Sequence, residues 1–315
     1  IMSVALIVVL IFGVETAGGI GAVIHNASEL PGYLSMTLSY DVNTGKAAPY
    51  SALTIVSTAA WGLGYFGMPH ILLRFMAIED EKKLKLSRRV ATIWVVISLF
   101  VAVFIGVIGY TMSKVGALEM LTGSNSETII VKISALLSQH GVIFALLAGV
   151  ILAGILASTM STSDSQLLAA SSAVSSDILG AFRKDSSNKN GSMAAARITL
   201  LVISVVAAFI ARNPDSSVFA IVSFAWAGFG AAFGPVVLFS LFWKRTNKWG
   251  ALAGMVCGGS MVFIWKYLIR PLGGIWNIYE LLPAFVLSCL AIVIVSLLTK
   301  EPSKEIYDEF DSVGK

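Results

Sequence analysis

Hydrophobic residues along this chain are gathered into long blocks, and short polar runs separate the blocks. A helix needs about 20 apolar residues to cross the hydrocarbon core of a bilayer, and most of the blocks are close to this length. They cover residues 1–24, 51–78, 90–113, 141–181, 198–211, 218–243, 251–268 and 279–298. The pattern predicts an all-α integral membrane protein with about eight transmembrane helices.

The polar runs have the composition expected of connections between membrane helices. They are a stretch over 25–50, a charged run over 79–89, a loop over 114–126 that leads to an amphipathic stretch ending near His140, a polar loop over 182–192, a short turn over Asn213–Ser216, and a charged tail over 300–315. The block over 141–181 is too long for one simple crossing, so we expect it to tilt, kink or extend beyond the membrane.

Composition supports the same class. Apolar residues make up 57% of the chain and charged residues 13%, whereas a soluble domain carries roughly a quarter charged residues. The net charge of +4 does not indicate nucleic-acid binding, because the basic residues lie in short loops between apolar blocks. Membrane lipid is therefore the expected surrounding of a multi-pass protein.

The distribution of positive charge predicts the orientation of the bundle. If the C-terminus lies inside, 16 of the 22 lysines and arginines fall on the inner side and six on the outer side. The chain also begins within an apolar run, without an initiator Met or a signal peptide. We therefore expect it to be the C-terminal part of a longer protein whose C-terminus is cytoplasmic.

Cysteine and histidine suggest neither a cofactor nor a metal site. Cys257 and Cys289 both fall inside apolar blocks, which is typical of packed thiols. His25, His70 and His140 are far apart in the sequence. No constellation of catalytic residues lies at one depth of the bundle, so we do not expect an enzyme.

The second block is interrupted over residues 60–70, where three glycines and a proline occur among apolar residues. Such residues weaken a helix, and free backbone groups are tolerated at membrane depth only where they line a cavity or are buried by protein. Trp61 and Tyr65 are spaced i, i+4 and share one face. Their rings could stack on a small organic substrate, or the segment could be a glycine-rich packing surface with two core aromatics.

The second unusual segment carries seven Ser, Thr or Asp residues within the eight positions Ser158–Ser165. In a helix the carbonyl of Ser158 meets the side chains of Ser161 and Thr162 one turn later, which places three oxygens on one face. These could bind a small hard cation together with another helix, or the hydroxyls could simply bond back to the preceding turn. Asp164 and Ser165 suggest a solvated inner vestibule, because an ionisable group in such a block is a functional candidate.

The sixth block is rich in small residues over 223–235. Gly230 and Gly234 are four positions apart, which suits a close contact between helices. We interpret this segment as a packing surface.

These segments resemble the bacterial sodium/proline symporters of the sodium:solute symporter family. The strings that carry the resemblance are WGLGYFGMPHI from residue 61, STSDSQLL from residue 161 and WAGFGAAFGPVVLFS from residue 226. The Ser/Thr string is shared across the wider family, whereas the two Trp-containing strings are more specific to the proline branch. The resemblance covers essentially the whole chain.

The resemblance implies a leucine-transporter-like fold, a five-plus-five inverted repeat of helices with flanking extra helices, of which this chain lacks most of the first repeat. The parts implied are the end of the last helix of the first repeat over 1–24, an extracellular loop over 25–50, the second repeat over 51–243 with its first helix broken near 62–69, two additional helices over 244–299 and a cytoplasmic tail over 300–315.

The function implied is sodium-dependent uptake of L-proline by alternating access, with Na⁺ as the coupling ion and no cofactor. The resemblance assigns the carbonyl of Ser158 and the hydroxyls of Ser161 and Thr162 to sodium. It assigns Trp61, Tyr65 and Pro69 to the proline site and its outer gate. The remaining ligands would come from the first helix of the first repeat, which this chain does not contain.

Two positions depart from the family pattern. Ser158 stands where many members have Ala, a change that a carbonyl ligand survives, and Asp164 stands where some relatives have Ser.

Two alternatives to proline symport remain: a sodium symporter of another amino acid, an osmolyte, pantothenate or a sugar, and a membrane sensor or channel module. The short tail after the last block gives a sensor little room for a signalling domain.

Overall fold

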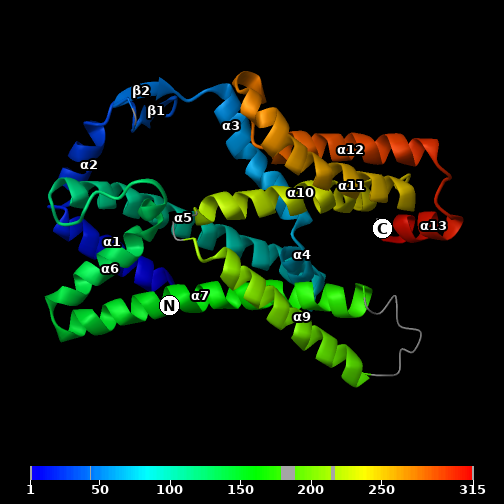
Figure 1. Cartoon of the computed structure of the whole chain (residues 1–315), viewed down its shortest axis with the longest axis horizontal. Helices are drawn as coiled ribbons and strands as arrows, with labels where there is room; N and C mark the ends of the chain where they lie inside the picture. Colours follow the sequence, from blue (N-terminus) through cyan, green and yellow to red (C-terminus); the bar gives the residue numbers. More distant parts are fainter. Residues whose placement is uncertain (1, 43, 179–188, 214–216, 314–315) are drawn as a thin grey trace. The chain divides into compact units, whose positions relative to one another are not determined.

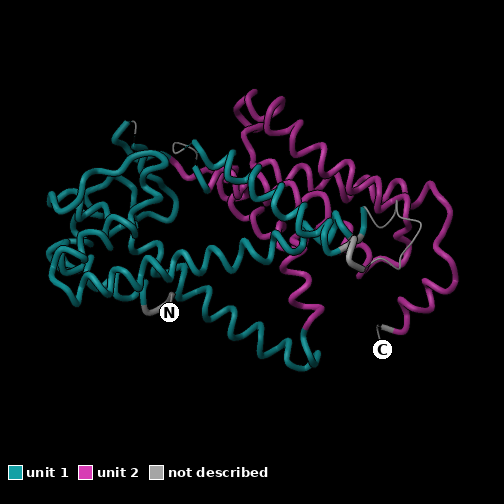
Figure 2. Tube along the Cα trace, turned by 60° about the horizontal axis from the view of Figure 1, so that its bottom comes forward, with its two compact units in different colours: residues 1–48, 78–218 teal, residues 49–77, 219–315 magenta. Residues whose placement is uncertain are grey.

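The computed structural model describes residues 2–42, 44–178, 189–213 and 217–313. Its described residues are mostly helical, as the hydrophobic pattern predicts (Figure 1). The chain divides into two compact units, residues 1–48 with 78–218 and residues 49–77 with 219–315 (Figure 2). Residues 182–188 of the predicted polar loop and 214–216 of the predicted turn lie outside the described residues.

Six described helices are long and apolar enough to cross a membrane, and a bent pair of shorter helices can supply a seventh. The remaining predicted crossing, over 51–78, is a broken helix. The predicted all-α membrane fold is therefore confirmed, and each predicted block corresponds to a helical segment. A two-stranded hairpin, β1 (Leu38–Asp41) with β2 (Lys46–Pro49), is the sheet found in the described part of the chain.

The first unit is built from helices around an aliphatic core. They are α1 (Met2–Thr16), α2 (Ile20–Ser28), α5 (Leu84–Lys114), α6 (Ile129–Leu137), α7 (Val142–Ser172) and α9 (Lys189–Ile210). Val9 from α1, Ile108 from α5 and Ile133 from α6 are almost completely buried in that core. After α2, Glu29 forms an ion pair with Lys114 at the end of α5, which fixes the two helix ends together.

The first predicted block contains two helices rather than one. The axes of α1 and α2 differ by 78°, and Gly18 and Gly19 between them have φ angles of +90° and +94°. Residues that carry a side chain rarely adopt positive φ angles. The glycine pair therefore permits a bend that apolar content alone does not reveal.

Two helices of the first unit are longer than a simple crossing. Both α5 and α7 have 31 residues, about 46 Å at 1.5 Å per residue, against about 30 Å for the hydrocarbon core. The helix α5 begins within the charged run predicted as a loop, and α7 continues into a π-helical turn, Ala173–Ile178. The predicted excess length of the fourth block is confirmed.

The second unit is built around the broken helix. Its elements are α3 (Ala52–Ala59), a 3₁₀ helix (Ala60–Gly67), α4 (Pro69–Met76), α10 (Val218–Phe242), α11 (Lys248–Ile264) with a π-helical end (Trp265–Ile269), α12 (Leu281–Leu298) and the tail helix α13 (Lys304–Val313). Small and aromatic residues dominate its core, among them Ala231, Ala284 and Phe285.

Helices α11 and α12 pack closely because α11 presents glycines to α12. A Cβ at Gly254 would lie 2.4 Å from Cγ1 of Ile292, so only glycine permits this separation. Inside the contact, the hydroxyl of Ser288 donates to the Gly254 carbonyl at 2.8 Å. The pair forms the rigid support beside which α10 and the broken helix lie.

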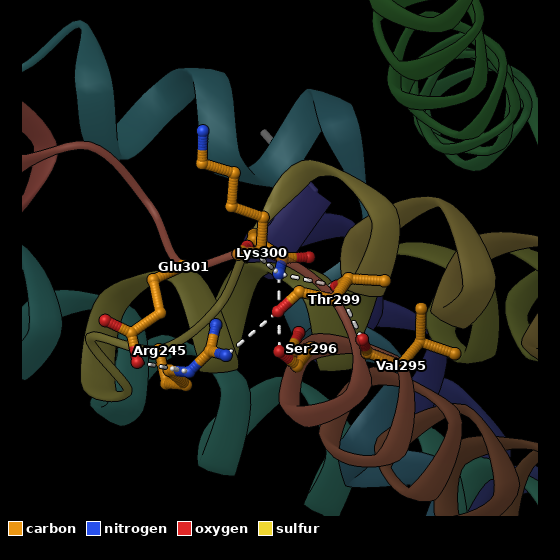
Figure 3. A network of polar contacts seen from close by, with 7 residues as sticks. Arg245, Val295, Ser296, Thr299, Lys300 and Glu301 are labelled. Carbon is orange, nitrogen blue, oxygen red and sulfur yellow. Dashed lines mark hydrogen bonds and ion pairs between the residues drawn. The ribbon is translucent and has the colours of Figure 1, made fainter.

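A polar cluster joins the start of α11 to the end of α12 (Figure 3). The amide of Asn247 donates to Oγ1 of Thr299 at 2.8 Å and to the Lys300 carbonyl at 2.9 Å, while its oxygen accepts from the Gly250 amide and caps α11. Arg245 donates to the Thr299 carbonyl at 3.0 Å. The same few side chains therefore form hydrogen bonds with groups at the start of α11 and at the end of α12.

Candidate functional site

The broken helix in the second unit results from local sequence chemistry. Ser51 caps α3 by accepting a hydrogen bond from the Thr54 amide at 3.2 Å. After eight residues the chain tightens into a 3₁₀ helix, and at Met68 it becomes extended, with ψ 110°. Pro69 then starts α4 at a position where its missing N–H costs nothing. The chain is thus irregular over residues 60–68 and resumes an α-helix at Pro69.

A side chain from α10 satisfies a backbone group at the break. The indole Nε1–H of Trp226 donates to the carbonyl of Trp61 at 3.0 Å. An unpaired carbonyl at membrane depth would cost several kcal/mol, so this bond stabilises the irregular backbone. It also fixes the Trp226 ring against the 3₁₀ helix.

Glycines on both elements permit this close approach. A Cβ at Gly64 would lie 2.0 Å from Nε1 of Trp226, and a Cβ at Gly230 would lie 2.7 Å from Cα of Gly64. A Cβ at Gly67 would lie 2.3 Å from the Phe229 carbonyl oxygen. Nothing lies within 4 Å of a Cβ built at Gly62. Two of the three glycines therefore serve packing, and the third does not.

The predicted packing role of the sixth block is confirmed. Gly230 and Gly234 are buried on α10 and face the broken helix. A Cβ at Gly234 would lie 2.8 Å from Cε2 of Phe285 and 3.5 Å from the Leu63 carbonyl. The small residues thus allow α10 to contact the broken helix and α12 at once.

Trp61 is the centre of an aromatic cluster. Its ring is nearly parallel to those of Phe219, Trp226 and Tyr279, with centroid separations of 5.6, 5.6 and 6.0 Å. Tyr65 meets the edge of Trp226 at 4.8 Å and 84°, and 51% of its surface is exposed. Trp226 therefore contacts both residues that the i, i+4 spacing placed on one face. Trp61 is held by protein rings, whereas Tyr65 is free to contact a ligand.

Tyr279 was not singled out by the sequence. It lies in the connection before α12, where no periodic pattern distinguishes it from neighbouring aromatics. Besides stacking on Trp61, it donates its hydroxyl to the Ser223 carbonyl at 2.6 Å and its backbone N–H to Oγ of Ser57 at 3.1 Å.

The oxygen-rich segment lies in the second half of α7, in the first unit. The hydroxyl of Thr162 donates to the Ser158 carbonyl at 3.3 Å, and that of Ser165 donates to the Ser161 carbonyl at 3.0 Å. Thr159 bonds back in the same way. These three hydroxyls therefore make the bonds to the preceding turn that were one of the two interpretations. The side chains of Ser161, Thr162 and Asp164 are exposed.

The geometry of this turn is compatible with cation binding as well. In a site where neighbouring ligands lie at right angles around the cation, cation–oxygen distances of about 2.4 Å, typical of Ca²⁺, place neighbouring ligand oxygens about 3.4 Å apart. The Ser158 carbonyl and Thr162 hydroxyl have nearly this separation. A hydroxyl can rotate its hydrogen away and offer a lone pair to a cation. The sodium assignment of Ser158, Ser161 and Thr162 stays a prediction.

The remaining site predictions also stay predictions. Pro69 is exposed at the start of α4, and no bound molecule is needed to explain its position. Trp61 and the α7 segment belong to different compact units, and the assignment of the first to substrate and of the second to sodium rests on the family resemblance.

The long apolar helices and the broken, aromatic-rich helix define a multi-pass membrane protein with the architecture of a transporter. None of the most apolar 18-residue window of α9 is buried within the chain, as a lipid-facing helix requires. The family model of the sodium:solute symporter family matches residues 1–258, and the chain belongs to this family. The resemblance drawn from the motifs is therefore confirmed.

Several relatives of this chain are proteins named as proline transporters. The osmoregulated proline transporter OpuE of Bacillus subtilis (strain 168) is 38% identical over 315 residues, covering 100% of this chain and 60% of that protein. A sodium/proline symporter of Haemophilus influenzae is 41% identical over 265 residues, 84% of this chain and 51% of that protein. A sodium/proline symporter of Escherichia coli (strain K12) is 39% identical over 259 residues, 82% of this chain and 50% of that protein. The chain thus spans half to three fifths of the length of these relatives.

Proposed function

We propose that the protein containing this chain is a secondary active transporter that takes up L-proline together with Na⁺. The observation that carries the proposal is the similarity to proline transporters over 82–100% of the chain, two of the three relatives being named for both sodium and proline. The broken helix supports it, because discontinuous helices form the substrate sites of many secondary transporters.

The proline site is proposed at the break in the second unit. Tyr65 is half exposed beside the ring of Trp226 and offers an apolar ring face to the pyrrolidine. Trp61 forms the floor of the site, since its ring is fixed by three aromatic neighbours. Pro69 starts the half-helix beyond the break and contributes to the outer gate. The carboxylate and imino groups of proline would be bound by backbone at the break and by the missing helices.

The sodium site is proposed on α7. The Ser158 carbonyl and the hydroxyls of Ser161 and Thr162 provide neutral oxygens, which bind a monovalent cation without holding it irreversibly. When Na⁺ arrives, the Thr162 hydroxyl exchanges its bond to the Ser158 carbonyl for the cation. This exchange gives up one hydrogen bond, about 1 kcal/mol, which is small compared with the energy of ion coordination.

The inner exit of the ion is proposed along the same helix. Asp164 is exposed and lies within one turn of Ser161, and Ser165 bonds back to Ser161. A carboxylate in a water-filled vestibule attracts the cation once the site opens inward. This path requires the C-terminal side to be cytoplasmic, the orientation that the distribution of Lys and Arg predicts.

Coupling needs no covalent chemistry. Sodium binding stabilises the outward-open state, proline then binds, and movement of the bundle exposes both sites to the cytoplasm. At a potential of about 100 mV one cation supplies about 2.3 kcal/mol, which corresponds to roughly 50-fold accumulation. The sodium concentration gradient adds to this value.

The proposal is tested by uptake of labelled L-proline into membrane vesicles that contain the full-length protein. We expect accumulation with an inward sodium gradient and only leakage when potassium replaces sodium. Unlabelled proline should compete, whereas other amino acids, osmolytes, pantothenate and sugars should not. Competition by one of those solutes at lower concentration than proline would assign a different substrate, and uptake independent of sodium would refute symport.

A further inference from the structure

Tyr279 is placed to act on the broken helix although it lies outside it. It precedes α12, one of the two helices that follow the predicted repeat, and it contacts three other segments of the second unit. Its ring stacks on Trp61, its hydroxyl bonds the Ser223 carbonyl of α10, and its backbone amide bonds the Ser57 hydroxyl of α3. One residue therefore ties the broken helix to α10.

Contacts of the neighbouring residue, Glu280, fix the position of Tyr279. Glu280 is 2% exposed, and its carboxylate accepts a hydrogen bond from Nη1 of Arg270 at 2.9 Å. The same guanidinium donates through Nε to Oδ1 of Asn277 at 3.1 Å. Arg270 thus contacts one residue before and one residue after Tyr279. A carboxylate so deeply buried holds its partner firmly, because separation would leave it unpaired.

The contacts of Tyr279 affect the residues that are proposed to bind substrate at the break. Trp61 stacks on Trp226, and Trp226 in turn contacts the half-exposed ring of Tyr65. A shift of Trp61 therefore changes the position of Trp226 and the shape of the surface beside Tyr65. Close packing transmits such shifts, because the interior has no space to absorb them.

We propose that Tyr279 is a positioning residue of the substrate site, which holds Trp61 and the break in the orientation that binds substrate. The inference rests on the proposed function, because the substrate concerned is the one bound beside Trp61 and Tyr65. The segment after the repeat then contributes to substrate affinity through Tyr279. This contribution is independent of the sodium site on α7.

The test compares Tyr279→Leu and Tyr279→Phe in the full-length protein, with the amount in the membrane measured for each variant. Leu removes the aromatic ring and the hydroxyl, and Phe removes the hydroxyl alone. We expect the apparent KM for proline to rise about tenfold for Leu and about threefold for Phe, from the loss of one aromatic contact and one hydrogen bond. The sodium concentration for half-maximal uptake at saturating proline should stay unchanged.

Tyr267→Ala is the matched control. Tyr267 is also a tyrosine of the second unit, it is 61% exposed, and its ring contacts in the described part of the chain are to Phe224 and Lys266. This variant should keep the wild-type KM for proline. A general loss of stability would lower the amount of protein in the membrane without changing KM, and that outcome would overturn the proposal.

The outcomes separate the two claims. A wild-type KM in the Phe variant, and in the Leu variant where it reaches the membrane, would refute the positioning role while sodium-dependent proline uptake by the wild type upheld the proposed function. Absence of that uptake in the wild type would refute the proposed function and the inference with it.

Discussion

Replacement of Gly64 by alanine tests the contact on which the broken helix depends. The new Cβ would lie 2.0 Å from Nε1 of Trp226, a separation that forces the indole to move. Overpacking of this kind costs about 1–3 kcal/mol. Movement of the indole also breaks its hydrogen bond to the Trp61 carbonyl, about 1 kcal/mol more. The expected loss is therefore about 2–4 kcal/mol, a change of about 30-fold to 1,000-fold in the unfolding equilibrium.

Gly62→Ala is the matched control for this variant. Nothing lies within 4 Å of a Cβ at Gly62, and alanine is favoured over glycine in helices by up to about 1 kcal/mol. Unfolding of the purified full-length protein in detergent, followed by tryptophan fluorescence, should show Gly62→Ala as stable as the wild type or more so. Equal stability of the two alanine variants would refute the packing argument.

Three further predictions concern polar contacts. Asn247→Asp should lower the thermal midpoint although Asp caps helices equally well, because it loses the amide that donates to the end of α12; an unchanged midpoint would show that capping alone matters. Lys114 lowers the pKa of Glu29, so this pair stabilises the protein above the unfolded pKa of about 4.3 and its contribution is lost as pH falls through the folded pKa. The difference in thermal midpoint between the wild type and Lys114→Met should therefore be clear at neutral pH and disappear in acid, and a constant difference would contradict the assignment. Arg270→Met should cost about 3–5 kcal/mol by leaving Glu280 buried and unpaired, and the double variant Arg270→Met plus Glu280→Met should recover most of that loss in the same unfolding assay.

Much of the fold follows from local patterns. Apolar content located the eight helical segments, because a bilayer requires long apolar helices. The break in the second block followed from Pro69 and the glycines before it, which act on their own backbone. The packing of Gly230 and Gly234 was likewise predictable, since their spacing places both on one face of α10.

Other features depend on contacts between distant parts of the chain. The bend between α1 and α2 needed the positive φ angles of Gly18 and Gly19, and a glycine pair in an apolar block does not reveal its conformation. Tyr279 is 218 positions from Trp61 in the sequence, so no local pattern connects them. The hydroxyls of α7 were compatible with bonding back or with cation binding, and the structure shows the first arrangement for Thr162.

We propose that the oxygen-bearing turn of α7 binds the coupling ion, and the sodium dependence of proline uptake in Ser161→Ala plus Thr162→Ala is the decisive test. We predict that half-maximal uptake by this double variant requires sodium concentrations higher by orders of magnitude. Thr159→Ala, which removes a hydroxyl bonded back on the same helix, should retain the wild-type requirement. An unchanged sodium requirement in the double variant would contradict the claim.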